Sequence, residues 1–202
     1  MKWNSSRTIA CLIILAAVIG VLIGYGLFRP KEVAVASVNG EKITKDQLYN
    51  VMLKSGGKDA LDSLISQKLV ALEANKQNVI VSNEEVQTEL QKYYDNYGSE
   101  DTFNQELTKN GYTLEEFKKE IINELSIRKI LEPQITITDE EMKSYFEENK
   151  TMFTPQGQTA NFEASKADVR EALLQSKLET QYSAWIDSLY QQYSVKNYIY
   201  GQ

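Results

Sequence analysis

The segment Thr113–Pro133, TLEEFKKEIINELSIRKILEP, contains the start and stop signals of one helix. Thr113 and Glu116 form a capping box, in which each side chain accepts a hydrogen bond from the backbone N–H of the other residue. Pro133 cannot continue a helix, because its ring removes the N–H donor and clashes with the preceding turn. The segment therefore predicts a helix over residues 114–132.

Three further capping boxes lie on either side of this helix. They pair Thr44 with Gln47, Ser82 with Glu85 and Thr138 with Glu141. With apolar residues at helical spacing, they predict helices over 45–54, 58–77, 83–97 and 139–150, and a shorter helix follows Ser99. The core-facing positions expected in the second of these helices are Leu61, Leu64, Ile65, Leu69 and Leu72. The boxes are unevenly spaced, so we expect a mainly α protein without a solenoid repeat.

A small β element is expected at the two ends of this helical region. Residues 33–38 are small and β-branched, and Asn39-Gly40 is a strong turn signal before a short return strand at 41–43. Residues 151–165 contain Pro155 and Gly157 and are expected to form a linker. A long helix at 166–193 and a terminal strand at 194–200 should follow, and we expect that strand to pair with 33–38, so that residues 166–202 pack back on the domain.

Residues 9–28, IACLIILAAVIGVLIGYGLF, form an uncharged run that can cross a membrane as a helix. Its length at helical rise is about 30 Å, the thickness of the hydrocarbon core. We predict a retained signal-anchor, with residues 1–8 in the cytoplasm and the C-terminal domain outside a bacterial cell membrane. A cleaved signal would have a shorter apolar run, and Cys11 lies too early in the run to be a lipidated cysteine. Gly20 and Gly24 form a GxxxG pattern that would allow a homodimer, although glycine is common in membrane helices.

Two missing residue types restrict the chemistry. The chain has no histidine, and its one cysteine is Cys11 in the apolar run. These absences exclude histidine-based catalysis, intrachain disulfides and nearly all structural zinc sites. The net charge of −6 disfavours nucleic acid as a partner. We therefore expect no metal, no cofactor and no catalytic residue.

Five segments in this order resemble the SurA/PrsA family of extracytoplasmic foldases. They are Val35–Thr44 (VASVNGEKIT), Leu61–Ala74, Val81–Val86 (VSNEEV), Gly111–Phe117 (GYTLEEF) and Ile137–Phe146 (ITDEEMKSYF). The resemblance implies that residues 33–150 form a helical chaperone domain that is closed by residues 166–202. In full-length members a parvulin-type prolyl isomerase domain lies between these parts, whereas residues 151–165 are too few to form one.

Aromatic residues beyond the needs of the core are the candidates for binding client polypeptides, because large rings give contact area at low entropic cost. They are Tyr93, Tyr94, Tyr97, Phe103, Tyr112, Phe117, Tyr145, Phe146 and Phe153. The alternative for each is that it belongs to the core face of its helix. Tyr94 points about 100° away from Tyr93 around the helix, so at least one tyrosine of this group should be accessible.

The function expected from these observations is that of a membrane-anchored extracytoplasmic chaperone. It would bind unfolded or newly exported polypeptides without prolyl isomerase catalysis. One alternative is an interaction module for a single secretion or sporulation partner. Another is a peptidyl-prolyl isomerase, as the resemblance alone would suggest, although the chain contains no histidine.

Overall fold

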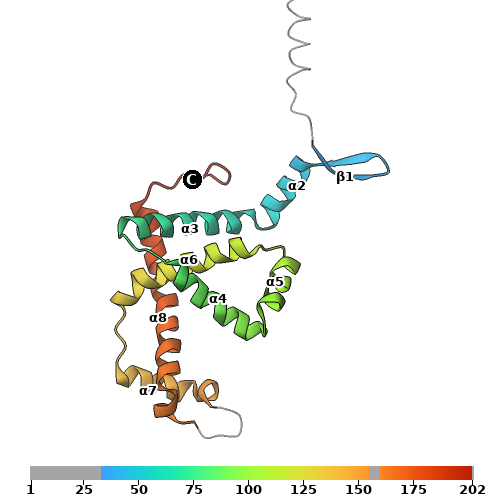
Figure 1. Ribbon diagram of the computed structural model, residues 1–202. Coiled ribbons are helices and arrows are strands. Elements are labelled where there is room, and N and C mark those ends of the chain that lie inside the picture. The colour runs from blue at the N-terminus through green and yellow to red at the C-terminus, as the bar shows by residue number, and fades with distance from the viewer. Residues whose placement is uncertain (1–32, 155–159, 202) are drawn as a thin grey trace, which may run out of the picture. The chain divides into compact units, whose positions relative to one another are not determined.

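The computed structural model describes residues 33–154 and 160–201, which divide into two compact units with a boundary at Lys58 (Figure 1). The apolar run 9–28, including Gly20 and Gly24, lies outside the described residues. Within the described ranges, no helix has the length and apolar character needed to cross a membrane.

The first unit contains a β-hairpin. Strands β1 (Ala34–Val38) and β2 (Glu41–Thr44) pair antiparallel. Asn39 and Gly40 connect them with φ angles of 52° and 88°, the left-handed values that a tight hairpin turn of this kind requires. The register pairs Ala34 with Thr44, Ala36 with Ile43, Ser37 with Lys42 and Val38 with Glu41. The sequence thus predicted the hairpin correctly.

Helix α2 (Lys45–Met52) follows the hairpin and continues through a π-helical turn, Leu53–Gly57. Within this turn Gly56 has non-helical backbone angles, with φ of 161° and ψ of 6°. Neither α2 nor the π-helical turn contains a buried residue.

The second unit is helical. Its α-helices are α3 (Lys58–Lys76), α4 (Asn83–Tyr97), α5 (Glu100–Lys109), α6 (Leu114–Leu131), α7 (Asp139–Glu148) and α8 (Phe162–Gln192). Two 3-10 turns, Glu132–Gln134 and Lys150–Phe153, follow α6 and α7. All four predicted capping boxes are confirmed, with both reciprocal hydrogen bonds present at Thr44, Ser82, Thr113 and Thr138. The mainly α fold class is therefore confirmed.

Helix α8 is the element against which most of the core packs. Val169 and Leu173 pack with α7 residues, and Leu174 and Leu178 pack with residues of α3 and α6. Nearer its C-terminus, Ile186 and Leu189 pack with Leu69 and Val70 of α3. Figure 1 shows the same arrangement, with α7 beside the N-terminal half of α8 and α3 beside its C-terminal end. A fourth cluster is built from α4, α5 and α6 alone.

Three details of the predicted helices differ from the structure. Helix α8 begins at Phe162 rather than at residue 166, because the side chain of Asn161 accepts a hydrogen bond from the backbone N–H of Ala164 and caps the helix there. In α3, Leu64 is 61% exposed and Leu72 is 39% exposed, so these two leucines do not face the core as expected.

The predicted strand at 194–200 is wrong. Residues 194–201 contain no strand, and β1 pairs with β2. The side-chain oxygen of Asn197 accepts hydrogen bonds from the backbone N–H groups of Ile199 and Tyr200, which folds this segment into a turn. Strand β1 pairs with the neighbouring β2, and the segment after α8 forms the Asn197 turn. The predicted pairing of 194–200 with 33–38 is therefore absent from the described residues.

Glu73 is a buried carboxylate that connects α3 to the end of α8. It accepts hydrogen bonds from Gln77 at 2.8 Å, Tyr193 at 2.8 Å and Gln192 at 3.0 Å, and Lys76 lies 3.3 Å away. Burial alone raises the pKa of the Glu73 carboxyl, but these hydrogen bonds outweigh burial and lower it to about 2. The ionised carboxylate therefore stabilises the junction of the two helices.

This junction predicts a specific acid sensitivity. Because the pKa of Glu73 is lower in the folded chain than its ordinary 4.5, its contribution to stability is complete above that pH and is lost as pH falls toward about 2. We expect Glu73→Gln to lower the free energy of unfolding by about 2–3 kcal/mol at pH 7 and by much less near pH 3. Urea unfolding at several pH values measures this difference.

The control for this experiment is Glu163→Gln, an exposed carboxylate in the first turn of α8. Its effect should stay below about 0.5 kcal/mol across the pH range. A Glu73→Gln effect that is equally large at pH 7 and pH 3 would show that the carboxylate charge does not stabilise the junction.

The capping boxes predict a second stability effect. Thr113→Ala removes the side chain that accepts from the backbone N–H of Glu116 at 3.2 Å, and should cost about 1 kcal/mol. Thr88→Ala is the matched control, because Thr88 lies inside α4 and bonds only back to the carbonyl of Glu84 in the preceding turn. Thermal unfolding should give a lower Tm for Thr113→Ala and a nearly unchanged Tm for Thr88→Ala. Equal shifts would contradict the capping role.

Candidate functional site

Five of the nine predicted aromatic residues form one cluster on α4, α5 and α6. The Phe103 ring is central, with ring centroids of Tyr93, Tyr94, Tyr97 and Phe117 at 5.8, 5.6, 5.3 and 5.0 Å. Tyr93 and Phe117 also contact each other edge to face at 4.9 Å. The helical spacing of the sequence therefore brings these residues together around a phenylalanine that is only 3% exposed.

Three more predicted aromatics lie around α7. Phe153 packs near Tyr145 at 6.2 Å and near Phe146 at 5.9 Å, and Phe162 of α8 contacts Phe146 at 5.6 Å. Phe146 and Phe153 are buried, and both belong to the cluster that holds α7 against α8. These rings are part of the core of this region.

The nine candidates differ in how much of each is accessible. Tyr97 and Tyr112 are each 47% exposed, and no ring contact to Tyr112 is seen among the described residues. Those of intermediate burial are Tyr93, Tyr94, Phe117 and Tyr145. The buried ones are Phe103, Phe146 and Phe153. Only Tyr97 and Tyr112 of the set therefore offer large accessible surfaces.

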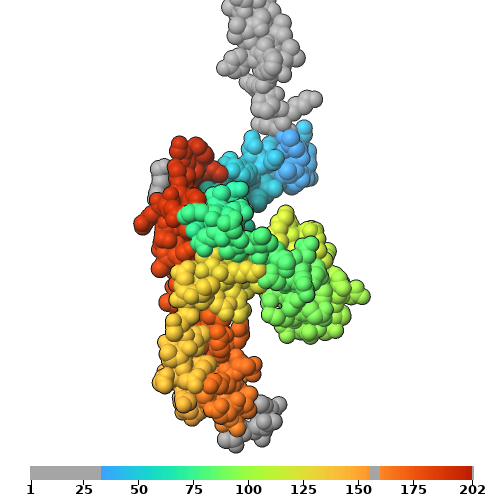
Figure 2. Space-filling model, turned by 60° about the vertical axis from the view of Figure 1, so that its left-hand side comes forward, coloured from blue at the N-terminus to red at the C-terminus, as the bar shows by residue number. Residues whose placement is uncertain are grey.

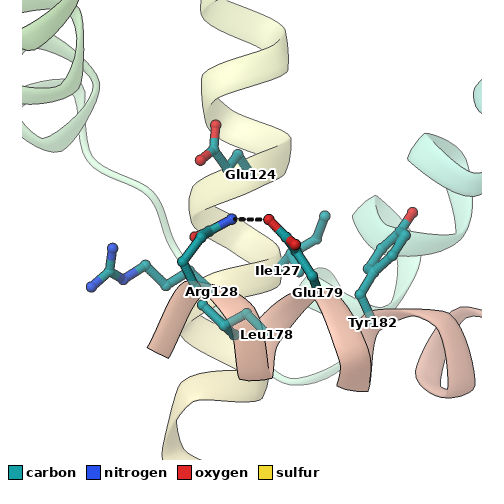
Figure 3. Close-up of a pocket in the computed structure, with 7 residues that line it drawn as sticks. Glu124, Ile127, Arg128, Leu178, Glu179 and Tyr182 are labelled. Carbon is teal, nitrogen blue, oxygen red and sulfur yellow. Dashed lines mark hydrogen bonds between the residues drawn. The ribbon is translucent and has the colours of Figure 1, made fainter. Parts of the chain in front are cut away.

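A groove between α6 and α8 was not predicted from the sequence. Figure 3 shows its walls, with side chains from α6 on one side and from α8 on the other. Its volume is about 200 Å³, and its lining is Glu124, Ile127, Arg128, Gln175, Leu178, Glu179 and Tyr182. A neighbouring hollow, whose lining includes Glu89, Lys92 and Glu171, is separate from this groove. Figure 2 shows the molecular surface hollowed between the green lobe of α4 and α5 and the orange N-terminal part of α8. The groove thus combines apolar side chains with charged ones at its edges.

Arg128 lies in the groove wall and is held by two carboxylates. Its Nη1 and Nη2 donate to the two carboxylate oxygens of Glu171 on α8 at 2.7 and 2.9 Å, and its Nε donates to Glu132 at 3.0 Å. The hydrogen bonds that the guanidinium donates to these carboxylates raise the pKa of Arg128, and Arg128 lowers the pKa of Glu171. The planar, bidentate pair connects α6 to α8 beside the groove.

Tyr93 of the aromatic cluster lies near Glu124 of the groove. Burial, followed by the nearby charges of Glu124, Glu89 and Glu120, raises the pKa of the Tyr93 hydroxyl. Burial and the charge of Glu89 also raise the pKa of Glu124. On α4, Tyr93 and Tyr97 are one turn apart and share a face. The aromatic cluster therefore comes near Glu124 of the groove through Tyr93.

The lining of the α6–α8 groove is suited to binding. Apolar side chains can lose water there, and the charged edge can orient a polar group. Within residues 33–154 and 160–201, no group of three or more Asp, Glu, Cys or His could hold a metal ion. Sequence reasoning missed the groove because Leu178 and Tyr182 belong to an apolar stripe that predicts core. On both helices a charged residue stands next to an apolar one in the sequence. This pattern was the signal from which the groove could have been predicted.

Comparison with known proteins agrees with this architecture. Residues 51–131 match the SurA-like N-terminal domain family. The foldase protein PrsA of Clostridium perfringens is 28% identical, over 71% of this chain and 54% of the relative. PrsA 1 of Lactiplantibacillus plantarum is 28% identical, over 84% of this chain and 55% of the relative. The chain thus spans about half the length of these curated relatives.

A solved structure has the same fold. The crystal structure of PrsA from Bacillus subtilis superposes with a TM-score of 0.55 at 14% identity, covering 85% of this chain and 96% of that one. Residues 51–131 therefore match a SurA-like N-terminal domain, and the chain is similar in sequence to PrsA foldases and in fold to a PrsA crystal structure.

Proposed function

We propose that this chain is a membrane-anchored extracytoplasmic chaperone that binds unfolded or newly exported polypeptides. The observation that carries the proposal is the open, partly apolar groove between α6 and α8. The exposed Tyr97 of the aromatic cluster offers a further apolar surface. Homology to proteins named foldases supports the same conclusion. An extended polypeptide can place apolar side chains in such a groove without a specific sequence.

The aromatic candidates contribute to this surface in two ways. Tyr97 and Tyr112 are the residues we propose to contact clients directly, because each is 47% exposed. Half-buried Tyr93, Tyr94 and Phe117 border the same region, and Phe103 supports them from below. Of the candidates around α7, Phe146 and Phe153 are buried in the core, and half-buried Tyr145 packs against Phe153.

The proposal includes the anchor. Residues 9–28 form an uncharged apolar run of membrane-spanning length, which favours a single span with the helical units outside the cytoplasm. Dimer formation through Gly20 and Gly24 remains a prediction. The partners are polypeptides rather than nucleic acid, in keeping with the net charge of −6.

We propose that binding occurs without prolyl isomerase catalysis. Helices α7 and α8 pack directly against each other, and the chain between the 3-10 turn at Lys150–Phe153 and the start of α8 at Phe162 is too short for an inserted domain. The chain also has no histidine for proton transfer. The activity supported by these features is retention of unfolded chains.

An aggregation assay tests the chaperone proposal. The full chain, in phosphatidylcholine nanodiscs, should suppress light scattering by several unrelated unfolded proteins when present in several-fold excess, with empty nanodiscs as the blank. Suppression for a single protein would favour the single-partner alternative. No suppression for any of them would refute the proposal.

A matched pair of tyrosine variants locates the surface. Tyr97→Ser removes an exposed ring of the aromatic cluster and should raise the amount needed for half suppression about threefold. Tyr198→Ser, at a position 89% exposed in the C-terminal segment, should leave it unchanged. Circular dichroism checks that both variants are folded, and equal effects of the two would contradict a role for Tyr97.

A refolding assay tests the absence of catalysis. A protein whose slow refolding phase is limited by X-Pro isomerisation should refold at the same rate with and without the chain. Catalytic acceleration by substoichiometric amounts would show that the chain is an isomerase.

A further inference from the structure

The charges around the α6–α8 groove are unequal. Arg128 is the one basic residue in the lining, whereas Glu124 and Glu179 are both acidic. Arg128 is itself already paired with Glu132 and Glu171. These five side chains therefore carry four negative charges and one positive charge.

The acidic side chains lie on both walls of the groove. Figure 3 shows Glu124 on α6 and Glu179 on α8, with Ile127 beside Glu179 in the view. Glu179 accepts a hydrogen bond from Gln175 at 3.3 Å on its own helix, which holds the carboxylate beside the opening. A segment that crosses the groove would pass both carboxylates.

The position of Glu124 increases the attraction for a cation. Burial and the neighbouring charge of Glu89 raise the pKa of its carboxyl in spite of the opposing charges of Arg128 and Lys92. A partly desolvated carboxylate beside a second carboxylate is stabilised by a cation that approaches both. An acidic segment would instead meet repulsion from both walls.

The apolar part of the groove has the capacity for one large side chain. The volume of the groove is about 200 Å³, compared with the ~150 Å³ of a cavity that accommodates a benzene ring. Ile127, Leu178 and Tyr182 supply the apolar lining. An extended strand advances about 3.3 Å per residue, so neighbours of the inserted residue remain within reach of the edges.

We propose that this groove selects extended polypeptide segments in which a large aliphatic or aromatic residue is flanked by lysine or arginine. The inference rests on the proposed chaperone function and names the class of segment that the groove takes. The apolar residue enters between Ile127 and Tyr182, and the flanking cations pair with Glu124 and Glu179. Selection is then local to this groove rather than a result of the chain's overall negative charge.

Two peptides that differ only in flanking charge test the proposal. Both have the same central Leu-Phe core, one between lysines and the other between glutamates, and each carries a fluorophore for anisotropy titration. The full chain in phosphatidylcholine nanodiscs should bind the lysine-flanked peptide about tenfold more tightly at low salt. This preference should shrink as salt is added.

Charge-reversed variants separate a local effect from a general one. In Glu124→Lys/Glu179→Lys the preference should reverse, and in the milder Glu124→Gln/Glu179→Gln it should disappear. The control Glu148→Lys/Glu163→Lys changes the net charge equally, at exposed positions near the α7–α8 turn. It should keep a clear lysine preference.

The outcomes distinguish this inference from the proposed function. Equal binding of both peptides to the unmodified chain, or an equal loss of preference in the control, would overturn the inference and leave the chaperone function intact if aggregation is still suppressed. If the chain binds neither peptide, the inference is overturned as well. Absence of both peptide binding and aggregation suppression would overturn the two together.

Discussion

The fold of the second unit depends on the burial of one long helix. Helix α8 extends from Phe162 to Gln192, and its buried residues enter three of the four apolar clusters of the described chain. Burial of such side chains supplies most of the favourable free energy of folding. The last turn of α8 is then held by Glu73, whose hydrogen bonds join sequence-distant helices. Without α8, α7 and α3 would each lose their main apolar partner.

The groove follows from the same packing. Where α8 crosses α6, Leu178 is buried against α6, while Tyr182 and the charged residues beside it remain at the edge. Helices α4 and α5 form their own cluster with α6, and the residues that line the groove come from α6 and α8. The Arg128–Glu171 pair connects the two walls. A rigid helix pair with an open edge is a suitable scaffold for holding extended chains, because the surface exists before a client binds.

Local signals in the sequence predicted most of the fold. The capping boxes and the Asn39-Gly40 turn depend on neighbouring residues, so their geometry could be derived directly. The structure of residues 194–200 could not be derived in this way, because pairing with a distant strand competes with local alternatives such as the Asn197 turn. The aromatic cluster was predicted in part, since helical spacing brings rings together but does not show which of them stay exposed. The groove depends on how two helices cross, and a stripe such as Leu178 and Tyr182 looks the same whether buried or at an edge.

The central claim is that unfolded polypeptides occupy the α6–α8 groove, and site-specific photo-crosslinking tests it most directly. A photoreactive residue at Gln175, in the groove lining, should crosslink to several unrelated unfolded clients, and the crosslinks should disappear when the clients are folded. The same residue at Gln191, near the end of α8, should crosslink weakly. Equal crosslinking at both positions, or none at Gln175, would contradict the account.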